Sequence, residues 1–202
     1  MTEASTVNSP SSITLRYLTE IQIESIASQK TPQGIIALVK IPEDVYVSEL
    51  PMNPGNKILF LEGVQDPGNV GTLIRTAAAF GYDGVLLDEH SADPFSPKVV
   101  QSTVGALFSV WVRKCPEAIS LIKNLLNVKY ELVAADIRGE LLKPELSIPK
   151  HVLAIGSEGA GLSSQVLAIT SLHVRIPFDN TKVESLNAAV AGSILMYVLS
   201  SK

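Results

Sequence analysis

The chain has 202 residues, of which 46% are hydrophobic and 18% are charged, and 16 basic against 20 acidic residues give a net charge of −4. This composition excludes a largely disordered chain and a polybasic nucleic-acid tail, and the single cysteine, Cys115, excludes a disulfide framework. Three scattered histidines predict no metal site. The absence of a long apolar run and of a secretory signal predicts a cytoplasmic protein without a membrane segment.

The first part of the chain is heterogeneous. Residues 1–12 are polar and Ser-rich, which predicts a disordered tail. A ragged helical period follows in residues 13–28, and the apolar run 35–41 predicts a buried strand. Residues 42–55 hold three prolines, a glycine and three acidic residues, which is typical of a linker.

From Lys57 onward, strands alternate with helices. A first helix is expected between Asn69, as its N-cap, and Gly81, as the first residue beyond it. Further helices are expected at 96–108, at 117–127, from Leu162 and at 184–201. Short apolar strands are expected at 57–64, 84–88, 109–112, 130–136, 151–157 and 172–177. Strands that are apolar on both faces predict one α/β domain over 57–202, a mostly parallel sheet with helices on both faces. Ligands bind at the carboxyl ends of such strands, so the loops after Val64, Ala135, Ile155 and Ile176 are the candidate site.

Two common nucleotide-binding motifs are absent. Gly63 and Gly68 have the glycine spacing of a P-loop, but Asn69 stands where that motif needs lysine. The glycines of the 156–161 loop lie too late in the chain and in the wrong order for a dinucleotide fingerprint.

The first candidate loop leads into a helix that carries Asn69 and Arg75. Asn69 could serve only as a helix cap. Arg75 stands among apolar and small residues, so its guanidinium should meet an anion, since an unpaired buried charge is costly. A structural ion pair with Glu62 or Asp66 is the alternative to a functional role.

Two later loops add further polar groups. Three glycines in the 156–161 loop let a ligand approach the backbone, and Glu158 among them is a candidate site carboxylate, although a capped glycine-rich turn is the alternative. Ser185 is a good N-cap for the last helix. Asn187, in its first turn among small residues, needs hydrogen-bond partners.

Together and in this order, the three motifs resemble those of the SpoU (TrmH-like) family of RNA ribose methyltransferases. An Asn followed six residues later by Arg corresponds to Asn69 and Arg75. A Gly-x-Glu-Gly-x-Gly loop corresponds to residues 156–161, and Ile-Pro followed by Ser-Leu-Asn corresponds to Ile176-Pro177 and 185–187. The resemblance covers residues 57–202.

The resemblance implies a C-terminal trefoil knot, a homodimer and S-adenosylmethionine bound in the knot at the subunit interface. It implies an RNA methyltransferase that acts on a ribose 2′-hydroxyl. The cofactor would contact Ala135, Gly156, Ile176 and Leu186. The catalytic candidate is Arg75, surrounded by a group that comprises Asn69, Glu158, Ser185 and Asn187.

The chain also departs from the family pattern. Gln101 stands in a segment where the family often has Arg, and residues 13–56 resemble only the end of a separate substrate-binding domain plus a linker. These departures motivate an alternative function, a catalytically weak RNA-binding dimer in ribosome assembly. Ribosomal RNA is expected as the substrate ahead of transfer RNA.

The acidic net charge constrains any RNA-binding role. RNA binding requires basic residues to gather on one face of the dimer, and the candidates are Arg75, Lys98, Arg113 and Lys182. Binding to RNA is then expected to be weak and strongly dependent on salt concentration.

Overall fold

Six parallel strands form a single sheet in the order β3-β2-β1-β5-β4-β6. In chain order the strands are β1 (Lys57–Glu62), β2 (Gly84–Leu87), β3 (Trp111–Lys114), β4 (Glu131–Leu141), β5 (His151–Gly156) and β6 (Leu172–Arg175). The two central strands are buried along nearly their whole length, since β1 and β5 pair from Lys57↔His151 to Glu62↔Gly156. The predicted parallel α/β sheet is confirmed. The third strand begins two residues later than predicted, and the fourth continues past an irregularity to Leu141.

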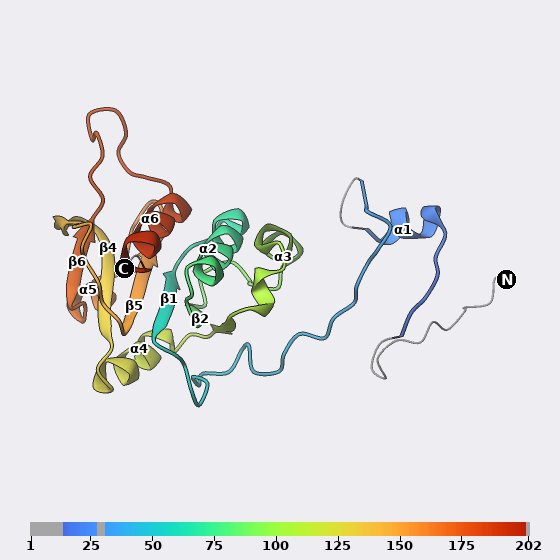
Figure 1. The fold of residues 1–202 in the computed structure, drawn as a ribbon, viewed down its shortest axis with the longest axis horizontal. Coiled ribbons are helices and arrows are strands. Elements are labelled where there is room, and N and C mark those ends of the chain that lie inside the picture. The colour runs from blue at the N-terminus through green and yellow to red at the C-terminus, as the bar shows by residue number, and fades with distance from the viewer. Residues whose placement is uncertain (1–13, 28–30, 201–202) are drawn as a thin grey trace. The chain divides into compact units, whose positions relative to one another are not determined.

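Helices cover both faces of the sheet. In the computed structural model, α2 (Pro67–Ala79), α3 (Pro97–Thr103) and α6 (Ala188–Ser200) gather along one side, and α4 (Ala118–Asn127) lies on the other (Figure 1). The short helix α5 (Ser164–Ala168) shares the core of α4 through the buried Val166, and a 3-10 turn, η1 (Ala106–Phe108), follows α3. Each face of the sheet therefore has its own apolar core.

Helix α2 begins earlier than the sequence predicts. Its N-cap is Asp66, whose Oδ1 accepts a hydrogen bond from the Asn69 N–H at 3.0 Å, so the predicted cap at Asn69 is wrong. Both residue types cap helices well, and Pro67 at the first helical position decides between them. The predicted end is confirmed. Gly81 has φ +70°, and the N–H groups of Gly81 and Tyr82 bond back to Ala78 and Ala77.

Helix α6 begins later than predicted. Its first residue is Ala188, and Asn187 Oδ1 accepts hydrogen bonds from the N–H groups of Ala189 (3.0 Å) and Val190 (3.2 Å). Asn187 therefore caps this helix, and the predicted cap at Ser185 is wrong. Asn187 leaves its side-chain NH₂ free to donate elsewhere.

The structure describes residues 14–27 and 31–200, and the chain divides into two units, Met1–Lys40 and Ile41–Lys202. The first unit contains α1 (Glu20–Ile26), capped by Thr19 and without a buried residue. The tail predicted in residues 1–12 lies outside the described residues. The strand predicted at 35–41 is wrong, because this segment pairs with no strand among the described residues and leaves Ile35 and Leu38 exposed.

The segment predicted as a linker, residues 42–55, packs along the edge strand β3. Val45 is buried and its carbonyl accepts a hydrogen bond from the Lys114 N–H at 2.8 Å. Arg113 is 6% exposed, bonds to the Glu49 carbonyl and forms an ion pair with Asp44 at 2.5 Å. The prediction that Arg113 belongs to an exposed RNA-binding face is therefore wrong, because its charge is used to hold this segment.

A buried pair, Tyr82 and His151, links helix α2 to the start of β5. His151 Nδ1 lies 2.5 Å from the Ile148 carbonyl, to which it must donate. In the neutral ring Nε2 then accepts from the Tyr82 hydroxyl at 2.8 Å. Burial lowers the pKa of His151 below 6.5, so the ring folds in its neutral form.

This pair predicts a loss of stability in mild acid. Below pH 6.5, the pKa of histidine in the unfolded chain, the unfolded chain binds a proton that the folded chain excludes. The free energy of unfolding therefore decreases as the pH falls, by up to about 1.4 kcal/mol per pH unit. Urea unfolding between pH 5 and 8 measures this dependence. A His151→Gln variant should lose this pH-dependent component between pH 5 and 6.5. An unchanged slope in that variant contradicts the assignment.

Candidate active site

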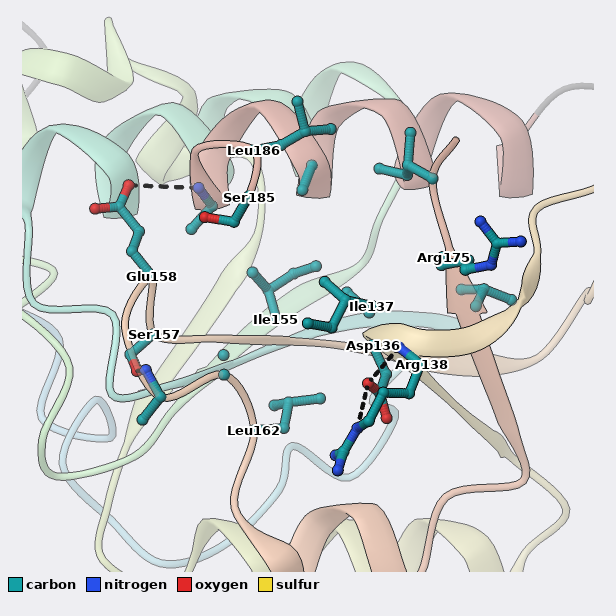
Figure 2. A pocket seen from close by; sticks show the side chains of 18 of the residues that line it. Asp136, Ile137, Arg138, Ile155, Ser157, Glu158, Leu162, Arg175, Ser185 and Leu186 are labelled. Atoms are coloured by element: carbon teal, nitrogen blue, oxygen red, sulfur yellow. Dashed lines mark hydrogen bonds and ion pairs between the residues drawn. The ribbon is translucent and has the colours of Figure 1, made fainter. Parts of the chain in front are cut away.

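The predicted loops meet at the carboxyl edge of the sheet, around a pocket of about 550 Å³. Its walls come from residues 135–138 within β4, from residues 155–162 at the end of β5 and beyond it, and from residues 174–188 between the end of β6 and the start of α6. Figure 2 shows Glu158 and Asp136 at opposite ends of this space, with Ile155 and Leu162 between them. All four predicted cofactor positions line this one pocket: Ala135, Gly156, Ile176 and Leu186.

The glycine-rich loop folds tightly against the end of β5. A Cβ atom on Gly156 would lie 2.2 Å from the carbonyl carbon of Gly161 and 2.4 Å from the nitrogen of Leu162. Gly161 itself has φ +69°, a conformation that other residues adopt at a cost. The pocket wall here is therefore backbone, with its peptide groups close to any bound molecule.

A polar group that the sequence reading missed lies at the other end of the pocket. Asp136, with a side chain only 10% exposed, accepts hydrogen bonds from the Arg138 N–H (2.9 Å) and guanidinium (3.3 Å) and from His173 Nδ1 (3.3 Å). Burial alone would raise the pKa of Asp136, but these hydrogen bonds outweigh it and hold the pKa below its usual range. Asp136 directly follows Ala135, a predicted cofactor residue, and this position in the sequence could have identified it as a site residue.

Three predicted catalytic residues form one hydrogen-bonded cluster. Glu158 Oε1 accepts from Asn69 Nδ2 at 2.9 Å, from Asn187 Nδ2 at 2.5 Å and from the Ala188 N–H at 3.4 Å. Asn187 Nδ2 also donates to Asn69 Oδ1 at 3.1 Å. One carboxylate oxygen thus joins the starts of α2 and α6 to the glycine-rich loop, beside the pocket.

The other two predicted residues lie apart from this cluster. Ser185 lines the pocket, and its side chain makes no hydrogen bond within the described part of the chain. Arg75 is exposed, and its guanidinium has no partner among residues 14–27 and 31–200. The alternative to a functional role, a structural ion pair of Arg75 with Glu62 or Asp66, is therefore wrong. Six residues after Asn69, it lies about 9 Å along α2 and about 120° around the helix.

None of the helices within 14–27 and 31–200 has the length and apolar character needed to cross a membrane. Across the same ranges, no three side chains of His, Cys, Asp or Glu gather as a metal site would require.

Residues 56–197 match the model of the SpoU rRNA methylase family. The chain is 35% identical over 190 residues to "23S rRNA (guanosine(2553)-2'-O)-methyltransferase RlmP" of Bacillus subtilis, a match that covers 90% of this chain and 71% of that protein. An uncharacterised tRNA/rRNA methyltransferase of Synechocystis is 34% identical, with 63% of its length covered. The chain therefore spans about two thirds of these relatives.

Solved structures agree with this match. The methyltransferase AviRb of Streptomyces viridochromogenes, in complex with the cofactor AdoMet, superposes with a TM-score of 0.68 and 30% identity, over 80% of this chain and 62% of that one. A TrmH-family protein of Porphyromonas gingivalis gives a TM-score of 0.71 and 34% identity, over 95% and 72% of the two chains.

Proposed function

Since the chain belongs to the SpoU rRNA methylase family, we propose that it transfers a methyl group from S-adenosylmethionine to a ribose 2′-hydroxyl of RNA. The observation that carries this proposal is the Glu158 cluster. It brings Asn69 and Asn187, from opposite parts of the domain, to the edge of a pocket lined by the predicted cofactor residues.

The pocket fits S-adenosylmethionine in size and chemistry. Its volume of about 550 Å³ lies within the range of small-molecule sites. Ile155, Leu162 and Leu186 offer apolar surface to a base, while the close-packed backbone at Gly156 offers peptide groups to its edge. The ionised Asp136 suits hydroxyl or ammonium groups at the other end. When bound, this cofactor supplies a methyl group already activated on a sulfonium.

The residues of the chain then have to position the hydroxyl and stabilise the charge that develops on it. The hydrogen bonds to Glu158 fix the loop that separates the pocket from the start of α2, so the site is preorganised. Arg75 supplies the positive charge for the developing alkoxide. A guanidinium keeps its proton in proteins, so Arg75 is not the proton acceptor, and the proton of the hydroxyl passes to a phosphate of the substrate or to a second residue.

We propose that the chain acts as a homodimer, because Arg75 does not line the pocket of its own chain. The exposed side chains of Val190 (48%) and Tyr197 (60%) support this proposal, because they leave apolar surface of helix α6 available for a partner to cover. In such a dimer Arg75 of one protomer completes the site of its partner.

The trefoil knot expected from the family resemblance is also part of this proposal. Strand β6 lies at one edge of the sheet, yet α6 packs on Leu73 of α2 and Ile155 of β5 through Gly192. The chain therefore crosses back over the sheet between residues 176 and 187, in the region where a knot would form.

The proposed substrate is ribosomal RNA rather than transfer RNA, and the proposed location is the cytoplasm. The RlmP relative, which is named for a 23S rRNA nucleotide, supports the choice of RNA. Exposed Arg75, Lys98 and Lys182 are the available RNA contacts now that Arg113 is assigned to the β3 edge.

Incubation with S-adenosylmethionine labelled in its methyl group, and with total RNA from cells lacking the enzyme, tests the activity. We expect label on one ribose, recovered as a 2′-O-methylated nucleotide after nuclease digestion. Label on bases contradicts the reaction type. Calorimetry distinguishes the alternative, an RNA-binding dimer without catalysis, which predicts no binding of the cofactor at millimolar concentration.

A further inference from the structure

A second cavity, of about 450 Å³, lies beside the first. It is bounded by residues 63–66 and Asn69 on one side and by residues 157–159 on the other. Residues 157–159 line both cavities, so this short loop is the wall that the two share. A molecule in the second cavity therefore approaches the cofactor pocket at the Glu158 cluster.

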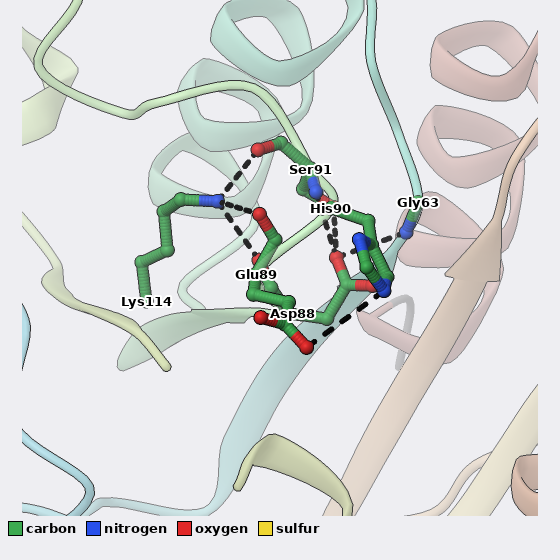
Figure 3. Close-up of polar contacts among 6 residues, drawn as sticks. All are labelled: Gly63, Asp88, Glu89, His90, Ser91 and Lys114. Atoms are coloured by element: carbon green, nitrogen blue, oxygen red, sulfur yellow. Dashed lines mark hydrogen bonds and ion pairs between the residues drawn. The ribbon is translucent and has the colours of Figure 1, made fainter. Parts of the chain in front are cut away.

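One wall of this cavity, residues 63–66, is held at Gly63 and Val64 by hydrogen bonds, and Figure 3 shows the contacts of Gly63 with the loop after β2. Asp88 Oδ1 accepts from the Gly63 N–H at 3.0 Å and from the Ser91 hydroxyl at 2.6 Å, and Ser91 Oγ in turn accepts from the Val64 N–H at 3.1 Å. Lys114 Nζ donates to the carbonyls of Asp88, Glu89 and Ser91 at 2.7–3.0 Å. These hydrogen bonds hold the loop that carries Gln65 and Asp66 in one conformation.

The polar groups that line the cavity are mostly hydrogen-bond acceptors or amides. Asp66 uses Oδ1 to cap α2, which leaves Oδ2 available, and the exposed Gln65 amide bonds to no other residue that the structure describes. The Asn69 N–H, with smaller contributions from Gly68 and Lys98, lowers the pKa of Asp66, so its carboxyl stays ionised. Since Glu158 adds a second carboxylate, the cavity disfavours a phosphate and suits a neutral group with N–H donors.

We propose that the second cavity receives the nucleobase of the target nucleotide, with Gln65 and Asp66 Oδ2 accepting hydrogen bonds from N–H donors on the edge of the base. This inference rests on the proposed methyltransferase function and names the substrate side of the same site. Lys98 is an exposed residue of α3, which packs so closely on α2 that a Cβ atom on Gly71 would meet Ser102. In this proposal Lys98 contacts a neighbouring RNA phosphate. The base is then separated from the methyl donor only by the wall formed by residues 157–159.

The substitution Gln65→Ala tests base recognition, and Gln165→Ala, at an exposed position of α5 outside both cavities, is its matched control. Labelled cofactor and total RNA from cells lacking the enzyme are the probes. We expect kcat/KM for RNA to fall about 5- to 10-fold in Gln65→Ala. Cofactor affinity and melting temperature should stay at the parent values, and Gln165→Ala should match the parent throughout.

The substitution Lys98→Ala tests the phosphate contact, with Lys123→Ala on α4, across the sheet, as control. The slope of log affinity for RNA against log salt concentration should become shallower by about 1 in Lys98→Ala and remain unchanged in Lys123→Ala. Equal slopes in the two variants overturn the phosphate contact.

The outcomes separate this inference from the function on which it rests. If the parent protein methylates a ribose and Gln65→Ala is as active as Gln165→Ala, the base pocket is wrong and the methyltransferase function stands. If the parent protein forms no ribose methyl group while it binds the cofactor, both are overturned.

Discussion

Replacing Arg75 with alanine is expected to lower the rate of RNA methylation under single-turnover conditions by about 100- to 1,000-fold, the usual effect of removing a group that stabilises a developing oxyanion. The side chain is exposed and unpaired within the described residues, so its loss should leave the melting temperature unchanged. It lines neither cavity of its own chain, so cofactor affinity by calorimetry should also be unchanged.

Arg75→Lys is the control for this prediction. It keeps a positive charge but loses the planar guanidinium, so it should recover only part of the lost rate. Full activity of Arg75→Ala, with the parent protein active, would remove Arg75 from the mechanism and leave the cofactor site unaffected.

Mixed dimers test whether Arg75 acts on the partner's site. A dimer of one Arg75→Ala protomer and one Asn187→Ala protomer retains one complete site only if Arg75 acts across the interface. Random pairing then restores about a quarter of the parent activity, since half of the dimers are mixed and each has one intact site. Recovery of no activity contradicts the proposed exchange.

Replacing Gly156 with alanine is expected to abolish cofactor binding. The added methyl group would lie 2.2 Å from the Gly161 carbonyl carbon, so the glycine-rich loop must move away from β5. We expect a loss of about 1–3 kcal/mol in stability, typical of an overpacked site, and at least about a 100-fold loss of cofactor affinity, because the displaced backbone is the pocket wall.

Gly159→Ala is the matched control in the same loop. A Cβ atom there meets nothing within 4 Å, and its φ lies outside the left-handed region. Because the added methyl group meets no atom, the urea midpoint of Gly159→Ala should equal that of the parent protein. Parent-like binding by Gly156→Ala would mean that the loop is not the wall of the cofactor site.

The sequence predicts the parallel sheet and the edge of the sheet at which the pocket lies, because both follow from one regularity. Apolar strands alternating with helices imply parallel pairing, and parallel pairing collects the ends of the strands at one edge. Ala135 in β4, Gly156 at the end of β5 and Ile176 directly after β6 line one pocket for this reason.

The wrong predictions for Arg75 and for the 35–41 run share a different cause, since each depends on which residues lie next to a given residue in the folded chain. Apolar neighbours in sequence suggested that Arg75 is buried, but it falls on the exposed stripe of α2 with Thr72 and Ala79. The apolar run at 35–41 has the composition of a strand but pairs with no strand within the described residues. Asp66 and Asn69 are both good caps, and Pro67, at the first helical position, selects Asp66.

The Glu158 cluster also has a consequence for how the protein folds. Its three side chains stand at positions 69, 158 and 187, and the oxygen that joins them accepts no bond until distant parts of the chain have met. Contacts of such long sequence separation form late and slowly, because the entropy of closing the intervening loops is lost first. A folding intermediate with β1, β2 and α2 in place but without α6 would contain part of the sheet and its core, but the Glu158 cluster would not yet have formed.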